Sequence, residues 1–393
     1  MYFLFGVYTV SLIALLVLGV REQRLHFANL DRIATRVLVN GIRGKSSITR
    51  LCAGALRGGG IVTVAKTTGT AARVIWPDAT EEPVYRKYDI VNIVEQIDIV
   101  RRAVSVRPDA LVMECMAVTP ALQEINQEKL VRSQIGVLCN VREDHLEEMG
   151  PTLDDVARSL ARTMPVGGVC VTAERDRLSL LEAEAARRNC RLRYADPGSV
   201  TDAEMDGFSY FTFKENVAIA LAVAAEVGVE RAAALRGMYA APPDPGVLRV
   251  DEYRVEGKLM RFANVFAAND PDSTVMNFQH LMDSGAIRPP IFTVINCRPD
   301  RVERNGQMGA IVPRLLTEKL FLIGHPTRSA RAGLPSGWTG KVVDLGGLNR
   351  EAVEIFRDLV GEIDHEASLV AVGNIHGQGE LLLEYMEELG ALR

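Results

Sequence analysis

The stretch Val39-Asn40-Gly41-Ile42-Arg43-Gly44-Lys45-Ser46-Ser47 decides the fold expected of this 393-residue chain. An apolar run at residues 36–40 predicts a buried strand before it, and residues 46–57 predict a helix directly after it. Glycines let backbone N–H groups close around phosphate oxygens, and the start of a helix adds a favourable dipole. Lys45 would then reach the β- and γ-phosphates of ATP, and the Ser46 hydroxyl would bind Mg²⁺. Because Val39 stands where the general P-loop pattern has glycine, a glycine-rich turn that binds no nucleotide is the alternative.

The rest of the chain alternates short apolar strands with helical stretches, and this βαβ rhythm is typical of a parallel sheet covered by helices. Further strands are predicted at residues 110–113, 134–139 and 168–172, and helices at 92–106, 153–163, 178–189 and 214–227. After a proline-rich linker at residues 240–246, strands are predicted near 255–262, 291–295, 319–323, 342–345 and 368–372. We therefore expect an α/β fold with a P-loop-containing parallel-sheet central domain, residues 33–241, followed by a smaller Rossmann-like α/β domain, residues 247–393.

The N-terminal stretch differs from this globular pattern. Residues 2–20 carry no charge and are nearly all apolar, which is the length needed to cross a bilayer. A secretory signal peptide is the alternative, but it would need a basic segment before the apolar run and small residues at a cleavage site. Arg21 and Arg24 follow the apolar run, so the positive-inside tendency places the catalytic domains in the cytoplasm. We expect a single-pass transmembrane anchor at residues 1–20 and localisation to the cell membrane.

Composition excludes some classes of function. The formal net charge of −5 argues against nucleic acid as a partner, because phosphate backbones are bound by basic surfaces. The six cysteines show no CxxC pair and no spacing typical of a zinc site or a disulfide framework. Most of them lie in apolar runs, which favours buried free thiols and suits a reducing cytoplasm.

Polar residues follow two other predicted strands. Glu114 ends the strand at residues 110–113, and open α/β sheets carry functional groups at the carboxyl ends of their strands. Its carboxylate suits Mg²⁺, with a strand-end ion pair as the alternative. Asp144 and His145 follow the strand at residues 134–139, where they are candidates to bind a metal or orient a base, although a lone histidine is more often structural.

Five segments together resemble the Mur ligases and folylpolyglutamate synthases. Residues 41–47 resemble their Gly-x-x-Gly-Lys-Thr/Ser loop, and residues 140–147 resemble their Asn-x-x-x-Asp-His-Leu-Asp signature. The other three are residues 214–220, 268–273 and 296–304, in the order in which the family carries them. The resemblance implies a ligase that uses ATP and Mg²⁺ to activate a carboxylate as an acyl phosphate, which an amine then attacks.

Residues 39–47, 65–73, 114–118, 130–133, 266–273 and 373–380 resemble more closely the ligase subunit of the poly-γ-glutamate synthases, which make a capsule polymer. This resemblance implies glutamate and the growing poly-γ-glutamate chain as substrates, and no separate N-terminal UDP-binding domain. It also implies small integral membrane subunits as partners, since one helix cannot form a pore for the polymer. Homo-oligomerisation stays open.

The resemblance assigns roles to individual residues. The catalytic set is Lys45, Glu114 and His145, and the metal ligands are Ser46, Glu114 and His145. The expected ATP contacts are Asn40, Gly41, Arg43, Gly44, Lys45, Ser46, Ser47 and Asn216, with Arg249 reaching the phosphates from the second domain. The expected substrate contacts are Lys66, Thr67, Thr68, Thr70, Arg73, Asn269, Asp272, Arg298, Asp300, Arg301, Arg304 and His376. For the threonine-rich loop and the arginine-rich loop, an ordinary polar turn and a solvated charged loop are the alternatives.

The sequence departs from the family at three places. Phe266 stands where relatives often hold ribose with an acid, and Asn269 replaces their usual histidine. The third departure concerns a lysine. Many relatives carry a carbamoylated lysine shortly after the Asp-His signature, whereas this chain has no lysine between Lys129 and Lys214. A second metal at His145 would therefore need another ligand. Two other functions remain as alternatives: a membrane-tethered P-loop ATPase or kinase that drives a partner, and a cytoplasmic Mur-type or folate-type ligase.

Overall fold

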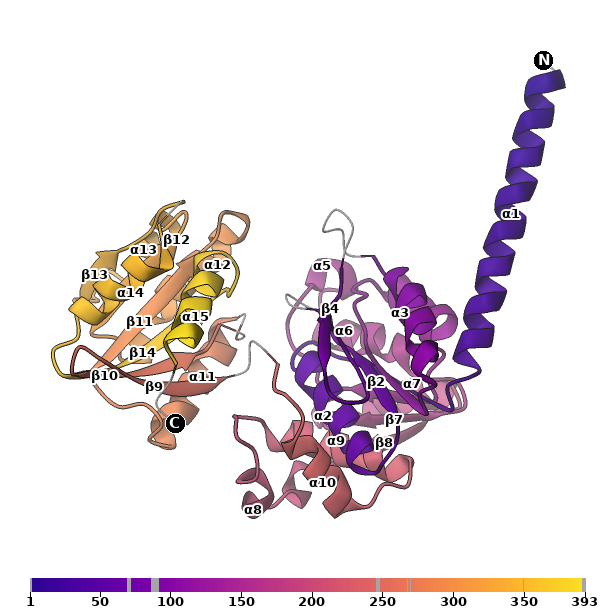
Figure 1. Ribbon diagram of the computed structural model, residues 1–393, viewed down its shortest axis with the longest axis horizontal. Coiled ribbons are helices and arrows are strands. Elements are labelled where there is room, and N and C mark those ends of the chain that lie inside the picture. Colours follow the sequence, from indigo (N-terminus) through magenta and orange to yellow (C-terminus); the bar gives the residue numbers. More distant parts are fainter. Residues whose placement is uncertain are drawn as a thin grey trace. The chain divides into compact units, whose positions relative to one another are not determined.

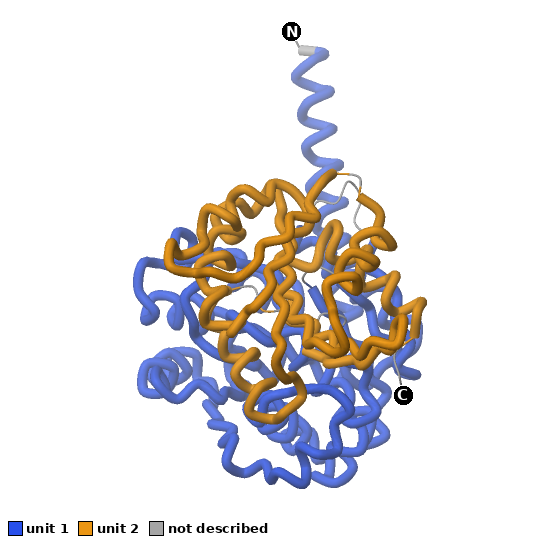
Figure 2. Tube along the Cα trace, turned by 90° about the vertical axis from the view of Figure 1, so that its left-hand side faces the viewer, with its two compact units in different colours: residues 1–244 blue, residues 245–393 orange. Residues whose placement is uncertain are grey.

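The computed structural model describes residues 2–68, 72–85, 92–244, 248–266, 268, 270–348 and 350–390. The chain divides into two compact units, residues 1–244 and residues 245–393, which Figure 2 colours separately. Each unit is built on one mostly parallel sheet with helices packed on it (Figure 1). The predicted α/β class, with a P-loop sheet followed by a smaller α/β sheet, is confirmed.

Unit 1 has an eight-stranded sheet in the order β4-β3-β2-β5-β1-β6-β7-β8. Its strands are β1 (Thr35–Asn40), β2 (Thr63–Lys66), β3 (Arg73–Ile75), β4 (Glu81–Pro83), β5 (Ala110–Glu114), β6 (Ile135–Leu138), β7 (Val169–Thr172) and β8 (Arg191–Tyr194). The strands from β2 to β8 in this order run parallel, and β3 and β4 form an antiparallel hairpin at one edge. All carboxyl ends of the parallel strands therefore meet at one edge of the sheet.

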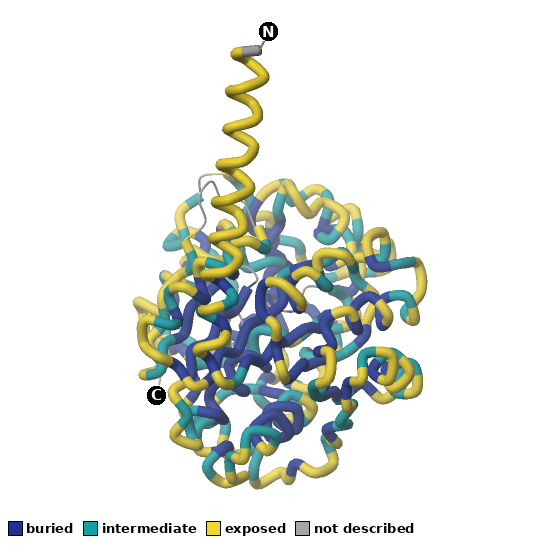
Figure 3. The backbone as a smooth tube through the Cα atoms, turned by 90° about the vertical axis from the view of Figure 1, so that its right-hand side faces the viewer, coloured by how far each residue is buried: buried dark blue, intermediate teal, exposed yellow. Residues whose placement is uncertain are grey.

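Alternating side chains of β1 explain why the sequence reads as one apolar run. Val37 and Val39 join the core cluster on one face of the sheet, and Leu38 joins the cluster on the other. Successive side chains of a strand point to opposite faces, so a strand covered on both sides needs apolar residues at every position. Figure 3 shows the resulting buried interior of the unit.

The helices of unit 1 cover both faces of the sheet. They are α2 (Lys45–Gly58), α3 (Glu95–Ala103), α4 (Pro120–Ile125), α5 (Leu146–Met149), α6 (Leu153–Leu160), α7 (Leu178–Arg187), α8 (Asp202–Met205), α9 (Lys214–Glu226) and α10 (Arg231–Tyr239). Helix α2 packs closely on α10, since a Cβ added to Gly237 would lie 2.0 Å from the carbonyl oxygen of Gly54. This contact fixes α2, whose first residues follow the glycine loop, against the body of the unit.

Helix α1 (Tyr2–Leu30) is longer than the apolar stretch that predicts it. Among the described residues, Phe3–Leu30 is the segment long and apolar enough to span a membrane, and its most apolar part is not buried in the protein (Figure 3). Its last turns pack on unit 1, where His26 Nε2 lies 2.9 Å from the carbonyl oxygen of Leu130. The Arg36 guanidinium donates to the carbonyl oxygen of Leu30 at 2.8 Å. The helix therefore continues from the apolar stretch into the folded unit.

Unit 2 has a six-stranded sheet in the order β13-β12-β11-β14-β10-β9, in which only β9 is antiparallel among the described strands. Its strands are β9 (Arg249–Val255), β10 (Lys258–Asn264), β11 (Ile291–Cys297), β12 (Lys319–Gly324), β13 (Lys341–Asp344) and β14 (Glu366–Gly373). Its helices are α11 (Pro271–Asp283), α12 (Val302–Ile311), α13 (Arg328–Ala332), α14 (Ala352–Gly361) and α15 (Gln378–Leu389).

The strand predicted near residues 255–262 corresponds to β10, but the structure begins it at Lys258 and adds the antiparallel strand β9 before it. The chain forms a hairpin there, in which Glu256 and Gly257 make the two-residue turn with φ of 51° and 78°. Two positive φ angles at the centre of such a turn match the twist of the flanking strands. Because a non-glycine residue occupies the first of these positions, the turn is hard to recognise from the sequence.

Candidate active site

The glycine loop lies at the carboxyl edge of the unit 1 sheet, between β1 and α2. Gly41 has φ of 138°, and a Cβ there would lie 2.7 Å from Cys139 Cβ at the end of β6. Gly44 has φ of 77° and precedes the first residue of α2. Both positions therefore require glycine, one for close approach and both for backbone conformation. The backbone N–H groups of Lys45, Ser46 and Ser47, in the first turn of α2, are of the kind that a helix leaves for an anion.

Two side chains follow this loop directly. The Lys45 ammonium donates to the carbonyl oxygens of Gly41 at 2.8 Å and Ile42 at 3.2 Å, so it lies over the loop. The Ser46 hydroxyl donates to Glu114 Oε2 at 2.7 Å, which joins the head of α2 to the end of β5. Glu114 is 3% exposed, and it also accepts from the Thr68 N–H at 2.8 Å and from the Thr68 hydroxyl. Four predicted site residues, Lys45, Ser46, Glu114 and Thr68, are thus brought together.

Asn40 has a supporting position instead of an exposed one. Its buried amide donates to Gln123 Oε1 at 2.9 Å and to the Thr163 hydroxyl at 3.2 Å. The side chain therefore faces the interior and holds the end of β1 in place.

The Asp-His signature supports the loop from β6. Asn140 Oδ1 accepts from the Arg43 N–H, and its Nδ2 donates to the Arg43 carbonyl oxygen, both at 3.0 Å. The Arg43 guanidinium lies 3.3 Å from Asp144 Oδ2. His145 has φ of 50° and precedes α5, and its ring lies 3.9 Å from Asp144 and 3.8 Å from Glu148. The structure thus places Arg43 beside the signature, and His145 beside two carboxylates rather than beside Glu114.

The threonine-rich loop begins inside the protein. Lys66 is fully buried at the end of β2, and its ammonium donates to Glu95 Oε1 of α3 at 2.5 Å. Thr67 accepts from the Arg73 N–H at 3.0 Å, which closes the base of the loop. Thr70 lies outside the described residues. Lys66 and Thr67 therefore shape the loop, and Thr68 is the member that reaches Glu114.

Asn216 and the strand-end thiols complete this edge of unit 1. Asn216 of α9 lies beside the glycine loop, because a Cβ on Gly44 would be 3.6 Å from its Oδ1. Burial raises the pKa of Cys139 to about 12, although the charge of Lys45 acts in the opposite direction. Burial also raises the pKa of Cys115, directly after Glu114. Both thiols stay protonated near neutral pH, so this edge offers backbone donors and oxygen ligands, and neither of these two thiols supplies a thiolate.

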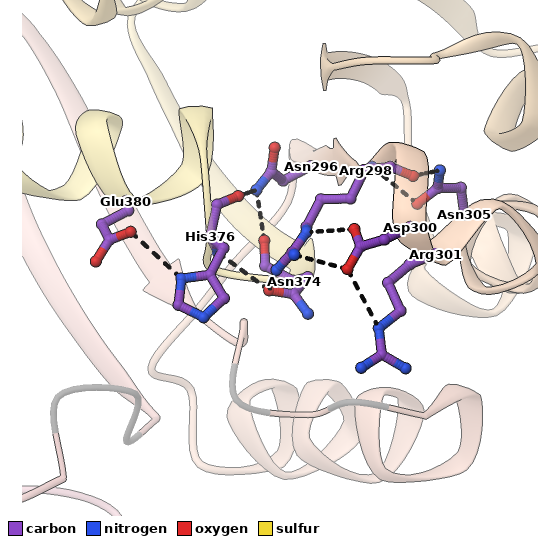
Figure 4. A network of polar contacts seen from close by, with 8 residues as sticks. All are labelled: Asn296, Arg298, Asp300, Arg301, Asn305, Asn374, His376 and Glu380. Atoms are coloured by element: carbon purple, nitrogen blue, oxygen red, sulfur yellow. Dashed lines mark hydrogen bonds and ion pairs between the residues drawn. The ribbon is translucent and has the colours of Figure 1, made fainter. Parts of the chain in front are cut away.

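Unit 2 carries a second polar network at the carboxyl ends of β11 and β14 (Figure 4). Arg298 donates to both carboxylate oxygens of Asp300, at 2.9 and 2.7 Å, and to Asn374 Oδ1 at 3.1 Å. Asn296 donates to the carbonyl oxygens of Asn374, at 2.5 Å, and His376, at 2.8 Å. These contacts bring the predicted residues Arg298, Asp300 and His376 together on two loops.

Two side chains of this network are more open. Arg301 Nε lies 3.9 Å from Asp300, and the Arg301 side chain is 52% exposed. The His376 ring lies 3.4 Å from Glu380 Oε2 of α15, and Figure 4 shows it apart from the arginines. Asp300 therefore orients Arg298, whereas the Arg301 side chain stays half exposed to solvent.

Arg249 and Asp272, which are also predicted site residues of unit 2, contact other side chains. Arg249 begins β9 and contacts Asp251 at 2.5 Å and Glu387 at 3.8 Å. Asp272 is exposed in the first turn of α11 and lies 3.6 Å from Arg314. Arg304 is partly exposed on α12, and Asn269 lies outside the described residues.

Comparison with known proteins decides the family. The model of the Mur ligase middle domain matches residues 39–232, and that of the poly-γ-glutamate synthase CapB C-terminal domain matches residues 250–389. The chain is 38% identical over 376 residues to PGA synthase CapB of Bacillus subtilis, covering 95% of each chain. It is also 38% identical over 392 residues to the capsule biosynthesis protein CapB of Bacillus anthracis, covering 99% of this chain and 83% of that protein. The chain belongs to the CapB family of poly-γ-glutamate synthases.

Solved structures place this CapB family member in the folylpolyglutamate synthase fold. E. coli FolC in complex with DHPP and ADP aligns with a TM-score of 0.67 at 14% identity, covering 93% of this chain and 92% of FolC. A bifunctional folylpolyglutamate synthase/dihydrofolate synthase with Mn, AMPPNP and L-glutamate bound aligns with a TM-score of 0.66 at 16% identity, covering 93% of each chain. At this identity the likeness establishes the fold alone, whereas the two family models and the two CapB relatives confirm the resemblance inferred from the motifs.

Several residues of the site were missed by sequence reasoning. Asn140 and Asn374 hold the two functional loops through their side chains, and Glu95 pairs with Lys66. Asn140 is the first residue of the signature segment and follows the end of β6, so its position at a strand end was a usable signal. Asn374 also had one, because it follows β14 beside a glycine. Glu95 gave no signal, since it lies on a helix 29 residues from its partner.

Proposed function

We infer that this chain is an ATP-dependent amide ligase that builds poly-γ-glutamate. The observation that carries the inference is the contact of Ser46 with Glu114 at the head of α2, in a chain that matches two CapB proteins over almost its whole length. The glycine loop supplies backbone donors and Lys45 for a triphosphate. A hydroxyl and a carboxylate beside them supply oxygen ligands.

The residues at this edge fit a divalent metal. Ser46 Oγ and Glu114 Oε2 are hard oxygen ligands 2.7 Å apart, and Mg²⁺ commonly takes one or two protein oxygens and fills its shell with phosphate and water. When bound, the ion would neutralise charge on the transferring phosphoryl group. Thr68 would hold the Glu114 carboxylate in place. His145 is proposed as a further ligand only with the help of Asp144 or Glu148, because those are the carboxylates its ring contacts.

The proposed reaction uses the loop for the first step. Lys45 and the N–H groups of residues 45–47 would bind the β- and γ-phosphates, while Asn216 and Arg43 border the nucleotide. A carboxylate oxygen of the growing chain would attack the γ-phosphorus, and the bond to the β-phosphate oxygen would break, releasing ADP. The amine nitrogen of an incoming glutamate would then attack the acyl carbon, lose a proton and expel phosphate.

Unit 2 is proposed to hold the incoming glutamate. Arg301 and His376 offer a cation and a ring nitrogen on loops that Asn296 and Asn374 fix, and an arginine fork suits a carboxylate. Arg298 would act with them, oriented by Asp300. A bifunctional folylpolyglutamate synthase/dihydrofolate synthase of the same fold was solved with Mn, AMPPNP and L-glutamate bound.

Helix α1 is proposed to anchor the enzyme in the cell membrane, with both units in the cytoplasm. At 29 residues it is about 44 Å long, enough to cross a hydrocarbon core of about 30 Å and continue into unit 1. Small integral membrane subunits are proposed as partners for export of the polymer. The cationic Arg21 and Arg24, just after the apolar stretch, support the cytoplasmic orientation.

The test measures ADP release by the full-length protein in detergent with Mg-ATP, with and without glutamate and short γ-linked oligomers. We expect release that depends on the glutamate species and falls by about a hundredfold or more in Lys45→Ala, because a cationic group at the transferring phosphoryl is lost. Lys129→Ala, an exposed lysine of the same unit, is the control. ADP release of equal rate with and without every glutamate species would instead support a partner-driving ATPase.

A further inference from the structure

Arg50 is a buried cation on the helix that starts at the phosphate loop. It lies four residues after Ser46 on α2 and is 2% exposed. Its guanidinium forks onto both carboxylate oxygens of Glu81 in β4, with Nη2 at 2.9 Å from Oε2. Burying a guanidinium is unfavourable unless it is paired, so its place in the fold is set by these partners. Glu81 does not belong to the glycine loop at residues 41–44.

Through Glu81 the guanidinium reaches the loop that supports the metal site. Glu81 pairs with Ile75 of β3, and β3 begins at Arg73, whose backbone bonds to Thr67. The residue after Thr67 is Thr68, which donates twice to Glu114. Arg50 therefore fastens the edge hairpin, and with it the base of this loop, to α2.

The same guanidinium also contacts the last residues of unit 1. Arg50 Nη1 donates to the carbonyl oxygen of Pro242 at 3.4 Å, and Nε lies 4.0 Å from Asp244 Oδ2. Nε has no hydrogen-bond partner among the described residues, although it is buried. The contact with Asp244 is thus an attraction over a distance longer than a hydrogen bond. Unit 1 ends at Asp244, so this segment is the covalent lead into unit 2.

We propose that Arg50 is a positioning residue that couples residues 242–244, the lead into unit 2, to the phosphate-binding helix and to the loop behind Glu114. The inference rests on the proposed ligase function. The partners of Arg50 described above are Glu81, Pro242 and Asp244, none of which belongs to the glycine loop. A small shift of residues 242–244 would let Asp244 accept a hydrogen bond from the buried Nε, which lacks a hydrogen-bond partner in the part of the chain that the structure describes. That hydrogen bond would favour the shifted position of the segment. Phosphate binding at the head of α2 and the position of the lead segment are thereby linked.

If Arg50 has a purely structural role, it only holds the β3–β4 hairpin against α2. That role needs only the fork onto Glu81, and its loss would lower stability without a nucleotide-dependent effect. Asp244→Asn separates the two roles, because it keeps the fork onto Glu81 and the size of the side chain and removes the charge facing Nε. Arg50→Lys keeps the charge and removes the fork geometry.

The experiment uses full-length protein in detergent, with Asp244→Asn, Arg50→Lys and the double variant. Arg231→Lys is the matched control, because Arg231 also forks onto a carboxylate of unit 1, that of Glu204. Hydrogen exchange of a peptide covering residues 238–252 is measured with and without AMPPNP, and kcat and the KM for ATP are taken from glutamate-dependent ADP release.

In the wild type and in Arg231→Lys we expect AMPPNP to slow exchange in this peptide, and in Asp244→Asn we expect that protection to be lost. Asp244→Asn should lower kcat about five- to tenfold with the KM for ATP within about twofold, which is the size of a modest coupling. The double variant should be no worse than the worse single variant, since the proposed coupling needs both the fork onto Glu81 and the charge of Asp244.

The proposal is overturned if AMPPNP protects residues 238–252 equally in the wild type and in Asp244→Asn, even where kcat falls. It is also overturned if the two single effects add. If Arg50→Lys fails to fold, Asp244→Asn alone decides. If the wild type shows no glutamate-dependent ADP release, the proposed function fails, and the exchange measurement still decides the coupling.

Discussion

The polar clusters of the two units occupy the same place in their sheets but differ in burial. In unit 1, Glu114 is 3% exposed and accepts three hydrogen bonds, from Ser46 and twice from Thr68. In unit 2, the side chains of Asp300 and Arg301 are each 52% exposed. Both clusters follow the carboxyl ends of parallel strands, where such folds place their ligands. The shared topology therefore fixes where a cluster lies, and burial decides how firmly each side chain is held.

The difference suits the two parts of the proposed reaction. Stabilising charge on a transferring phosphoryl group requires donors and ligands that are fixed before the reaction. Gripping a free amino acid requires room for it to enter, so exposed cations such as Arg301 are suitable. Arg298 stands between the two cases, because Asp300 and Asn374 orient its guanidinium while the loop stays at the surface.

The largest effect is expected where the buried cluster loses its charge. Glu114→Gln keeps the size of the side chain but weakens an oxygen ligand. We expect the Mg²⁺ concentration for half-maximal ADP release to rise about 10- to 100-fold, as for weakened metal sites. Glu174→Gln is the control, because Glu174 is also buried beyond a strand of this sheet but bonds to the Val141 N–H. An unchanged Mg²⁺ requirement in Glu114→Gln would show that the buried cluster is a strand-end contact and not a metal site.

A smaller and different effect is expected in the exposed cluster. Arg301→Ala should raise the KM for glutamate about tenfold and leave the KM for ATP unchanged, since it removes one charge-assisted hydrogen bond. Arg254→Ala is the control, because Arg254 is an exposed residue of β9, the edge strand of the same sheet, where it pairs with Leu259 of β10. Steady-state kinetics with varied glutamate measures the change. An unaltered KM for glutamate would favour the alternative of a solvated charged loop.

The sequence sufficed for the parts of the site that depend on neighbours in the chain. Gly41, Gly44, Lys45 and Ser46 act within one strand-loop-helix segment, so their spacing alone predicted their arrangement. Glu114 was predicted because it ends an apolar strand, and topology brings parallel strand ends together.

Long-range pairs could not be predicted in the same way. Asn40 was expected at the nucleotide, yet its amide bonds inside the protein to Gln123, 83 residues away. Strands β2, β3, β4 and β8 were also missed. They have three or four residues each, and β4 is a polar edge strand that pairs only with β3, so neither length nor alternation marked it.

The comparison between the two strand-end clusters can be sharpened with an ion pair that has short hydrogen bonds but is only partly buried. Arg231 forks onto Glu204 at 2.8 and 2.9 Å, and the Arg231 side chain is 44% exposed. If burial separates firm from weak contacts, Glu204→Gln should lower the free energy of unfolding by only about 0.2–1 kcal/mol, the range for exposed pairs. The hydrogen bond from Arg231 lowers the pKa of Glu204, and solvent screening of this partly exposed pair limits the free energy that the shift represents. Because the pKa is depressed in the folded state, this stabilisation is present above the unfolded pKa of about 4.3 and is lost as pH falls toward the lowered pKa of the folded state.

Denaturant unfolding of the wild type and Glu204→Gln at pH 7 and at the lowest pH where both fold measures this difference. We expect the difference in free energy of unfolding between the wild type and Glu204→Gln to become smaller at the lower pH, where Glu204 begins to be protonated in the unfolded chain. Asp98→Asn supplies the control, since Asp98 pairs with Arg101 on the surface of α3, where both side chains are more than half exposed, and should shift stability still less. A loss well above 1 kcal/mol in Glu204→Gln would mean that geometry, and not burial, sets the strength of these pairs. The contrast between the two strand-end clusters would then need another explanation, such as the number of hydrogen bonds that Glu114 accepts.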